Sequence, residues 1–142
     1  MMNNILLVED NPDHVLLVQE AFEEAKSTST IHIVEDGLEA LKFLNRDNPY
    51  ETAPCPDLIL LDLNLPRKDG RELLRDLKQD GGLSAIPVIV FTSSSAQQDI
   101  DMCYSLHANC YITKPVGFDQ YVEIMQMIEE FWFSTIKLPT HY

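Results

Sequence analysis

The sequence predicts an α/β fold in which helices cover both faces of one parallel sheet, and two observations support this prediction. The stretch LILLDLNLP, residues 58–66, begins with four aliphatic residues in a row, which is typical of a strand buried on both faces. Apolar runs of strand length also alternate along the chain with segments of helical periodicity. This alternation predicts parallel strands joined by right-handed crossovers.

Five short apolar runs are the expected strands, and polar residues follow each of them directly. They occupy residues 4–8, 31–34, 58–61, 87–91 and 109–112. In a parallel sheet the carboxyl ends of all strands lie at one edge, where ligands bind in open α/β folds. The polar residues after the runs are therefore expected to gather at that edge.

The first two helices are expected over residues 12–25 and 38–44, where apolar residues recur at helical spacing. Asn11 can cap the first of these helices, and Pro12 suits its first turn. Residues 45–56 contain three prolines and no apolar periodicity, so they are expected to form an extended loop within the domain.

The last three helices are expected over residues 71–79, 95–106 and 118–135. Gly81 and Gly82 mark the end of the first of these helices. Ser95, with Gln98 three residues later, would form a capping box at the start of the second. The long apolar periodicity of the third predicts that the chain closes with a helix packed on the sheet.

The chain is expected to be one domain, with a core over about residues 3–135 and a tail over residues 136–142. No apolar run approaches the roughly 20 residues that span a bilayer, and no basic segment precedes the first apolar run as in a signal peptide. Cys55, Cys103 and Cys110 lack C-x-x-C spacing, so they are expected to be reduced thiols in a cytoplasmic protein.

The net charge is −13, from 23 acidic and 10 basic residues. A field of this sign repels phosphate backbones and disfavours direct binding of nucleic acid. Most of the acidity can serve solubility alone. An acidic cluster at one site could still attract a divalent cation.

Residues able to carry chemistry follow four of the five expected strands. They are Glu9 and Asp10 after the first, Asp62 after the third, Thr92 after the fourth and Lys114 after the fifth. Three carboxylates at one edge would repel one another unless a cation neutralised them, and hard oxygen ligands suit Mg²⁺. The backbone carbonyl of Asn64, where the chain turns back, is expected to add another metal ligand.

This set of residues matches what phosphoryl transfer to a carboxylate requires. Asp62 would attack an incoming phosphoryl group in line, while Mg²⁺ and Lys114 would neutralise the phosphoryl oxygens. Thr92 would donate a hydrogen bond to one of these oxygens. The product would be an acyl phosphate on Asp62.

Taken together, these motifs resemble those of the response-regulator receiver domains of two-component signalling. The resemblance rests on VEDNPD, LDLNLP-RKDG, VIVFTSSS and YITKP, which stand in the family's order and spacing. It implies a flavodoxin-like (βα)5 domain with strand order 2-1-3-4-5. Carried over position by position, the phospho-acceptor falls on Asp62, the lysine on Lys114, the hydroxyl switch on Thr92, and the acidic pair on Glu9 and Asp10.

The same resemblance implies further details of the site. Tyr111, three residues before Lys114, would be an aromatic switch whose ring fills the space that Thr92 leaves as it moves towards the phosphoryl group. The peptide bond between Lys114 and Pro115 is expected to be cis. Asp is also common where this chain has Glu9, so Asp10 is the expected direct metal ligand.

The resemblance also implies a partner, a sensor histidine kinase that donates the phosphoryl group. The proline-containing loop, Asp57 and the aromatic tail resemble the single-domain receivers of bacterial, notably cyanobacterial, phytochrome kinases. Such a protein is not a conventional enzyme. It would catalyse its own phosphorylation and dephosphorylation and would signal by contact with other proteins.

The last expected helix is apolar around more than half of its circumference, which is more than one sheet face can cover. The surplus predicts a partner surface, most simply of a homodimer through the last helix and strand, although a folded-back tail could cover it instead. The residues expected at this surface are Tyr121, Ile124, Met127, Phe131, Trp132 and Phe133.

Two other functions stay open at this point. A metal-dependent phosphohydrolase would also use Asp62 as nucleophile, but Asn64 stands where the D-x-D arrangement of aspartate-based phosphatases has a second Asp. A pure interaction module would never turn over phosphate. In a receiver, Asn64 and Ser94 are expected to tune the lifetime of the phosphate by controlling the access of water. Four residues without metal-ligand spacing are expected to be structural or surface residues: His14, His32, His107 and His141.

Overall fold

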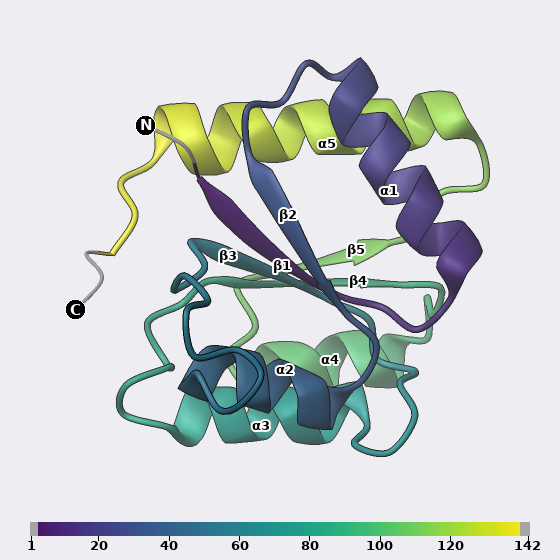
Figure 1. Cartoon of the computed structure of the whole chain (residues 1–142). Coiled ribbons are helices and arrows are strands. Elements are labelled where there is room, and N and C mark those ends of the chain that lie inside the picture. Colours follow the sequence, from purple (N-terminus) through teal and green to yellow (C-terminus); the bar gives the residue numbers. More distant parts are fainter. Residues whose placement is uncertain (1–2, 140–142) are drawn as a thin grey trace.

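The computed structural model describes residues 3–139 and contains a five-stranded parallel sheet. The strands are β1 (Asn4–Val8), β2 (Thr30–Val34), β3 (Leu58–Leu61), β4 (Val88–Thr92) and β5 (Cys110–Thr113). Their order is β2-β1-β3-β4-β5, which confirms the predicted order and places β3 at the centre (Figure 1). Because every neighbouring pair is parallel, all the carboxyl ends lie at one edge.

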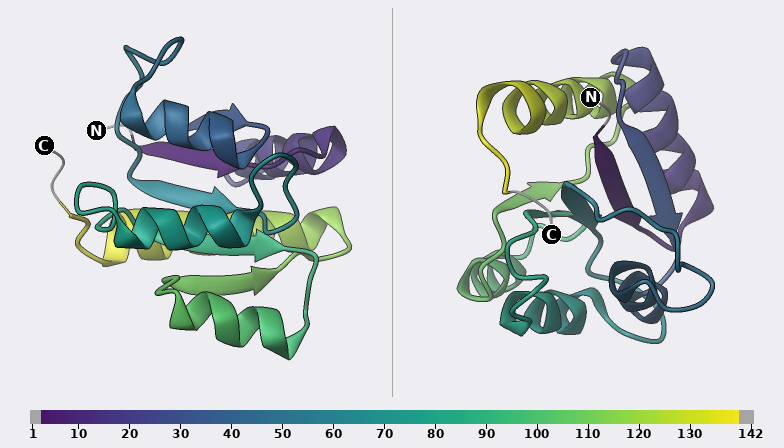
Figure 2. Two further views of the ribbon diagram at one scale, coloured as in Figure 1. Left: turned by 90° about the horizontal axis from the view of Figure 1, so that it is seen from below. Right: turned by 60° about the vertical axis from the view of Figure 1, so that its left-hand side comes forward.

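Helices cover both faces of the sheet, as predicted. They are α1 (Pro12–Glu24), α2 (Gly37–Asn45), α3 (Gly70–Gln79), α4 (Gln97–Ser105) and α5 (Phe118–Glu130). Helices α1 and α5 lie on one face, and α2, α3 and α4 lie on the other, where they are seen in front of the strands in the view from below (Figure 2). The result is the predicted flavodoxin-like arrangement of three layers.

The central strand β3 is buried on both faces, as its aliphatic run predicted. All of its side chains are fully buried. Leu58 and Leu60 pack in the layer that also holds α1 and α5, whereas Ile59 and Leu61 pack in the layer of α2 and α3. Asp62, which directly follows β3, is therefore positioned by packing on both sides of the sheet.

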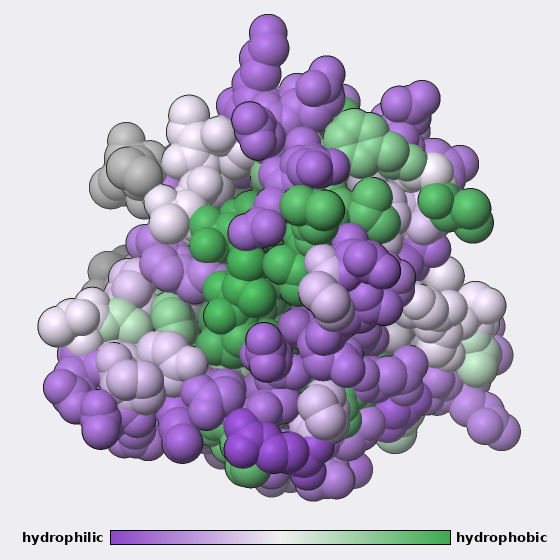
Figure 3. Space-filling view, turned by 45° about the vertical axis from the view of Figure 1, so that its right-hand side comes forward, coloured by the Kyte–Doolittle hydropathy of each residue, from purple (hydrophilic) through white to green (hydrophobic). Residues whose placement is uncertain are grey.

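The edge strand β2 has partly exposed apolar side chains, although its apolar sequence resembles that of a buried strand. Among the described residues, β1 is the only strand that pairs with β2, and Ile31 and Ile33 of β2 are half-buried. Figure 3 shows apolar side chains gathered in the middle of the face that includes this edge, within a hydrophilic surround.

The amino end of α1 is formed as predicted. The side chain of Asn11 accepts hydrogen bonds from the backbone N–H of Asp13 at 2.9 Å and of His14 at 3.4 Å. Pro12 is the first helical residue, where it loses no backbone hydrogen bond. This cap fixes where α1 leaves the carboxyl edge of the sheet.

The predicted capping box at Ser95 is wrong. Helix α4 begins at Gln97 after Ala96, and no side chain in the part of the chain that the structure describes caps it. The hydroxyl of Ser94 instead accepts the backbone N–H of Ala96 at 3.3 Å. A serine that bonds the backbone two residues later forms a local turn, and this turn delays the start of the helix.

Helix α5 continues into one π-helical turn over Phe131–Thr135, so the predicted extent of 118–135 is confirmed with a wider last turn. The backbone N–H of Ile136 donates to the carbonyl of Phe131 at 3.0 Å, which satisfies one carbonyl at this end. Within residues 3–139, neither α5 nor any other helix is both long and apolar enough to cross a membrane.

The peptide bond between Lys114 and Pro115 is trans, so the expectation of a cis bond there is wrong. Within the described part of the chain, the cis peptide joins Asn48 to Pro49 in the loop before β3. The two isomers before proline differ by only about 0.5–1 kcal/mol. Local packing therefore decides the isomer, and a sequence motif does not.

Candidate functional site

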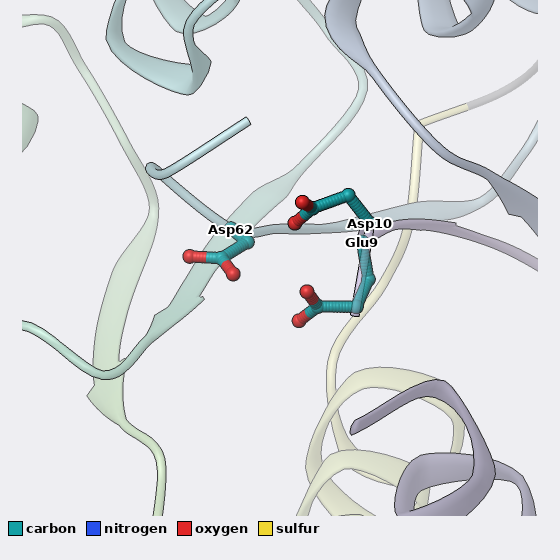
Figure 4. Close-up of side chains that lie close together, drawn as sticks. All are labelled: Glu9, Asp10 and Asp62. Carbon is teal, nitrogen blue, oxygen red and sulfur yellow. The ribbon is translucent and has the colours of Figure 1, made fainter. Parts of the chain in front are cut away.

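Three carboxylates meet at the carboxyl edge of the sheet. Glu9 and Asp10 directly follow β1, and Asp62 directly follows β3. The carboxylates of Glu9 and Asp10 point towards Asp62 (Figure 4), and one oxygen from each of the three residues lies within 4.8 Å of the others. Glu9 and Asp62 are buried, whereas Asp10 is exposed. The predicted acidic cluster is present, and its oxygen atoms are close enough for one divalent ion to contact them together.

Asp62 accepts hydrogen bonds from three directions. Thr92, fully buried at the end of β4, donates to its Oδ1 at 2.7 Å. Lys114, which follows β5, donates to Oδ2 at 2.9 Å. The backbone N–H of Asn64 donates to Oδ1 at 3.3 Å. The structure thus brings together Asp62, Thr92 and Lys114, which are distant in sequence.

Lys114 contacts more side chains of the site than Thr92 does and links its two buried carboxylates. Its side chain is only 4% exposed, and its ammonium group contacts three acceptors. Two of these are carboxylates, Asp62 at 2.9 Å and Glu9 in a short contact. The third is Nδ1 of His14 at 2.9 Å. One cation therefore offsets two buried negative charges.

The charges of the site act on one another. Burial raises the pKa of Asp62, but the hydrogen bonds from Lys114 and Thr92 outweigh it and hold this pKa below its ordinary value of 3.8. Burial is also the largest influence on Glu9 and, together with the charge of Asp62, keeps its pKa above 4.5 despite Lys114. Burial lowers the pKa of Lys114, but its bonds to Glu9 and Asp62 prevail and raise it. Asp62 is therefore ionised and Lys114 protonated at neutral pH.

His14 lies in the site, so the expectation that it is a structural or surface residue is wrong. Besides its contact with Lys114, its Nδ1 lies 3.9 Å from Oε1 of Glu9. Burial, followed by the positive charge of Lys114, lowers its pKa from 6.5. The sequence feature that could have predicted this position is the place of His14 in the first turn of α1, four residues after Asp10. Side chains on a helix tilt towards its amino end, so His14 points towards the end of the helix that begins beside Asp10. The amino end of α1 lies at the carboxyl edge of the sheet.

The other described histidines are structural or surface residues, as predicted. His32 lies on β2, where its Nε2 is 3.0 Å from the side-chain oxygen of Asn4. His107 is exposed in the turn after α4. His141 lies outside the described residues.

The loop after Asp62 is fixed by a close backbone contact and by an ion pair. A Cβ on Gly70 would lie 2.2 Å from the backbone oxygen of Asp62, so only glycine permits this approach. Arg67, with a φ of 61°, donates to Oδ2 of Asp36 from Nε at 2.8 Å and from Nη2 at 2.6 Å. This charge-assisted pair ties the loop to the amino end of α2. Asn64 lies exposed within the loop.

Tyr111 lies on β5 beside the loop between β4 and α4. Its hydroxyl donates to the backbone oxygen of Ser94 at 2.8 Å, and the hydroxyl of Ser94 donates to Asp99 at 2.6 Å. Arg71 donates to the other oxygen of Asp99 from Nε at 3.0 Å and from Nη2 at 2.9 Å. These contacts connect the expected aromatic switch with α3 and α4.

The expectation that Tyr121 lies on a partner surface is wrong. Its side chain is 2% exposed, and its ring meets that of Phe91 edge to face at a centroid distance of 5.6 Å. The reason is that this side of α5 packs onto the sheet, which a helical wheel cannot place without knowing the orientation of the helix.

The rest of the expected partner surface lies on α5 and the π-helical turn that follows it, and part of it packs against the core. Met127 is 59% exposed and Phe131 is 52% exposed, while Ile124, Trp132 and Phe133 are half-buried. A hollow of about 300 Å³ opens between α5 and β5, bordered by Ile124, Met127, Phe131 and Trp132 among others. An apolar surface is therefore present where the sequence predicts one, without Tyr121.

The fold and the site together define the class of the protein. Residues 5–126 match the response regulator receiver domain family, and the chain belongs to this family. Acceptance of a phosphoryl group from a histidine kinase and binding of a divalent metal ion at an acidic pocket are general features of receiver domains.

Individual relatives within this family are similar to the chain over nearly its whole length. The chain is 46% identical over 135 residues to response regulator Rcp1 of Synechocystis sp., covering 95% of this chain and 92% of Rcp1. It is similar to the crystal structure of the phosphorylated cyanobacterial phytochrome response regulator RcpA, with a TM-score of 0.92, 46% identity, and coverage of 99% and 100% of the two chains. The Mn²⁺-bound form of Rcp1 is also similar, with a TM-score of 0.89, 45% identity, and coverage of 97% and 99%. The chain is thus a response regulator homologous to phytochrome response regulators.

Proposed function

We propose that this chain receives a phosphoryl group on Asp62 from a phytochrome-type sensor histidine kinase, with Mg²⁺ as the metal. The observation that carries the proposal is the pair of donors at Asp62, because Thr92 contacts one carboxylate oxygen and Lys114 the other. Donors already aimed at this carboxylate lie where they can also reach the oxygens of a phosphoryl group attached to it.

In the proposed reaction, one oxygen of Asp62 attacks the phosphorus of a phosphohistidine in line. A P–O bond forms as the P–N bond breaks, and the electron pair of that bond leaves with the imidazole of the kinase. Asp62 enters the reaction ionised because the hydrogen bonds from Lys114 and Thr92 outweigh the effect of burial on its pKa. Lys114 and Thr92 then stabilise the negative charge of the transferred group.

Glu9, Asp10, Asp62 and the backbone carbonyl of Asn64 are the proposed metal ligands. The mutual closeness of the three carboxylates fits one small cation, and hard oxygen donors favour Mg²⁺ over softer metals. When bound, the ion supplies positive charge to the phosphoryl oxygens. Glu9 already bonds to Lys114, so the exposed Asp10 is the proposed direct ligand.

The decisive experiment is intact mass measurement after incubation with Mg²⁺ and acetyl phosphate. We expect a gain of one phosphoryl group that is lost in Asp62→Asn and retained in Asp101→Asn, a matched change of an exposed carboxylate on α4. No gain in the unmodified chain would contradict the proposal and favour a pure interaction module. Rapid multiple turnover of varied phosphoesters would contradict it in favour of a hydrolase.

The phytochrome partner is proposed because the solved structures to which the chain is similar include proteins named as phytochrome or bacteriophytochrome response regulators. Transfer of ³²P from a purified phytochrome-type kinase should be faster than transfer from an unrelated histidine kinase at equal concentration. Equal rates from both kinases would contradict this partner. We also propose a cytoplasmic location. Histidine kinases are phosphorylated by ATP, and the three cysteines of this chain are free thiols.

We also propose that Thr92 and Tyr111 form the output switch. Thr92 would leave its present bond to Asp62 for a phosphoryl oxygen, and the Tyr111 ring would move into the vacated space and break its bond to Ser94. Crystal structures with and without beryllofluoride, a phosphoryl mimic, test this. The same Tyr111 rotamer in both would contradict the switch.

The proposed occupant of the apolar surface on α5 and β5 is a second copy of this chain. Sedimentation of Met127→Glu and Phe131→Glu, compared with Leu16→Glu as a control at a similarly exposed apolar residue on α1, tests it with and without phosphorylation. The first two variants should be monomeric while the control dimerises. A strict monomer of the unmodified chain at high concentration in both states would contradict the homodimer.

The lifetime of the phosphate is proposed to depend on Asn64, two residues after Asp62, and on Ser94, two residues after Thr92. Asn64 is exposed and Ser94 is half-buried, so both can affect the approach of water. Loss of the phosphoryl mass with time in Asn64→Ala and Ser94→Ala measures this effect. Unchanged rates in both variants would count against it.

A further inference from the structure

The ammonium group of Lys114 has all of its hydrogens engaged. A protonated lysine offers three N–H donors and no acceptor. Here the three partners are Asp62 Oδ2, Glu9 Oε1 and His14 Nδ1. The two carboxylates come from loops of the sheet, whereas His14 comes from the first turn of α1.

This contact determines the protonation of His14. Because Lys114 can only donate, Nδ1 of His14 must accept with its lone pair, and the ring proton therefore lies on Nε2. The ring is thus neutral in this arrangement, in keeping with the lowered pKa that burial and Lys114 give it. His14 is the only uncharged one of the three partners, and at 30% side-chain exposure it lies nearer to solvent than Glu9 or Asp62.

We propose that His14 is a positioning residue that holds the third hydrogen of Lys114 ready for the incoming phosphoryl group. This inference rests on the proposed phosphorylation of Asp62. As the phosphoryl group arrives, Lys114 exchanges the neutral nitrogen of His14 for an anionic oxygen, and its bonds to Asp62 and Glu9 can remain. The exchange is favourable because a hydrogen bond between two charged groups is stronger than one to a neutral acceptor.

The chemical type of the residue at this position matters for that role. A carboxylate would hold Lys114 more strongly and would add a negative charge beside Glu9 and Asp62. An apolar side chain would leave the third hydrogen to water or let the ammonium group turn fully onto the two carboxylates. A neutral acceptor orients the lysine and releases it at low cost.

Two substitutions separate this role from simple packing. The oxygen of an asparagine at position 14 and Nδ1 of His14 both lie three bonds from Cα, so His14→Asn keeps an acceptor in place while His14→Leu removes it. Phosphorylation by acetyl phosphate, followed by intact mass, should be roughly three- to tenfold slower in His14→Leu and near the unmodified rate in His14→Asn. Asp13→Asn, an exposed change in the same helical turn, serves as the control and should leave the rate unchanged.

Nitrogen NMR of the unmodified chain supplies a measurement that packing alone would not move. In the presence of Mg²⁺, the His14 ring should carry its proton on Nε2, and the Nδ1 resonance should shift when beryllofluoride is added and Lys114 turns away. A proton on Nδ1 in the Mg²⁺-loaded protein would overturn the inference, as would a rate in His14→Leu equal to that of the unmodified chain. Failure of the unmodified chain to gain a phosphoryl group would instead overturn the proposed function.

Discussion

Replacing Lys114 by methionine would leave two carboxylates side by side in a buried site without their shared cation. The side chains of Lys114, Glu9 and Asp62 are 4%, 3% and 8% exposed. Removal of one partner from a buried ion pair costs about 3–5 kcal/mol, since the remaining charge keeps its desolvation penalty. For a domain of this size, the loss corresponds to a decrease of about 9–15 °C in Tm.

Thermal unfolding of Lys114→Met in a metal-free buffer at neutral pH measures the effect. Lys68→Met is the matched control, because Lys68 pairs with Asp76 at the surface, where those side chains are 18% and 43% exposed. A surface pair contributes under about 1 kcal/mol, so the control should melt within about 3 °C of the unmodified chain.

Two further results are expected for Lys114→Met. Mg²⁺ should raise the Tm of this variant more than that of the unmodified chain, because the ion supplies the missing positive charge. The deficit in stability should also shrink as the pH falls from neutral towards the raised pKa of Glu9, since Glu9 can then take up a proton. A Tm within about 3 °C of the control, or equal stabilisation of both proteins by Mg²⁺, would refute the reasoning.

Three other predictions concern residues around the site. In Asp36→Asn, the free energy of unfolding should fall less steeply at acid pH than in the unmodified chain. Burial raises the pKa of Asp36, but a backbone N–H and Arg67 outweigh it and hold the pKa below 3.8. The ionised carboxylate therefore stabilises the fold above pH 3.8, and this stabilisation is lost as the pH falls through the lowered pKa. Urea unfolding at several pH values measures this, and an unchanged acid limb would contradict it. In Asp99→Asn, hydrogen exchange in the loop between β4 and α4 should become faster, because Ser94 and Arg71 lose the negative charge of the carboxylate that they share, and unchanged exchange there would count against the proposed connection. Tyr121→Ala should lower the free energy of unfolding by about 3–5 kcal/mol in chemical denaturation. A loss under about 1 kcal/mol would contradict the burial of Tyr121.

The functional positions after the strands could be predicted because their placement depends on local pattern alone. An apolar run marks each strand, and the residue that follows it must lie at the carboxyl edge of a parallel sheet. Asp62, Thr92 and Lys114 were found in this way, and their contacts agree with that placement. The two errors in α4 and Lys114–Pro115 arose where several local conformations have similar free energies, as at a serine-rich turn or a proline peptide bond.

Contacts between elements could not be predicted in the same way. His14 and Lys114 are separated by 100 residues, and Arg67 and Asp36 by 31. No periodicity relates the members of such pairs. They meet because helix α1 and the loop after β3 are packed at particular angles against the sheet.

For this protein, the sequence by itself determined the order of elements, the edge of the sheet that carries the site, and the residue types able to accept a phosphoryl group and bind a metal. These follow from patterns of burial and strand ends that act over a few residues. Only the tertiary structure decided which side of α5 faces the core, so that Tyr121 is buried while Met127 and Phe131 are exposed. It also decided that His14 completes the hydrogen bonds of Lys114, because side-chain contacts across elements depend on how whole helices pack.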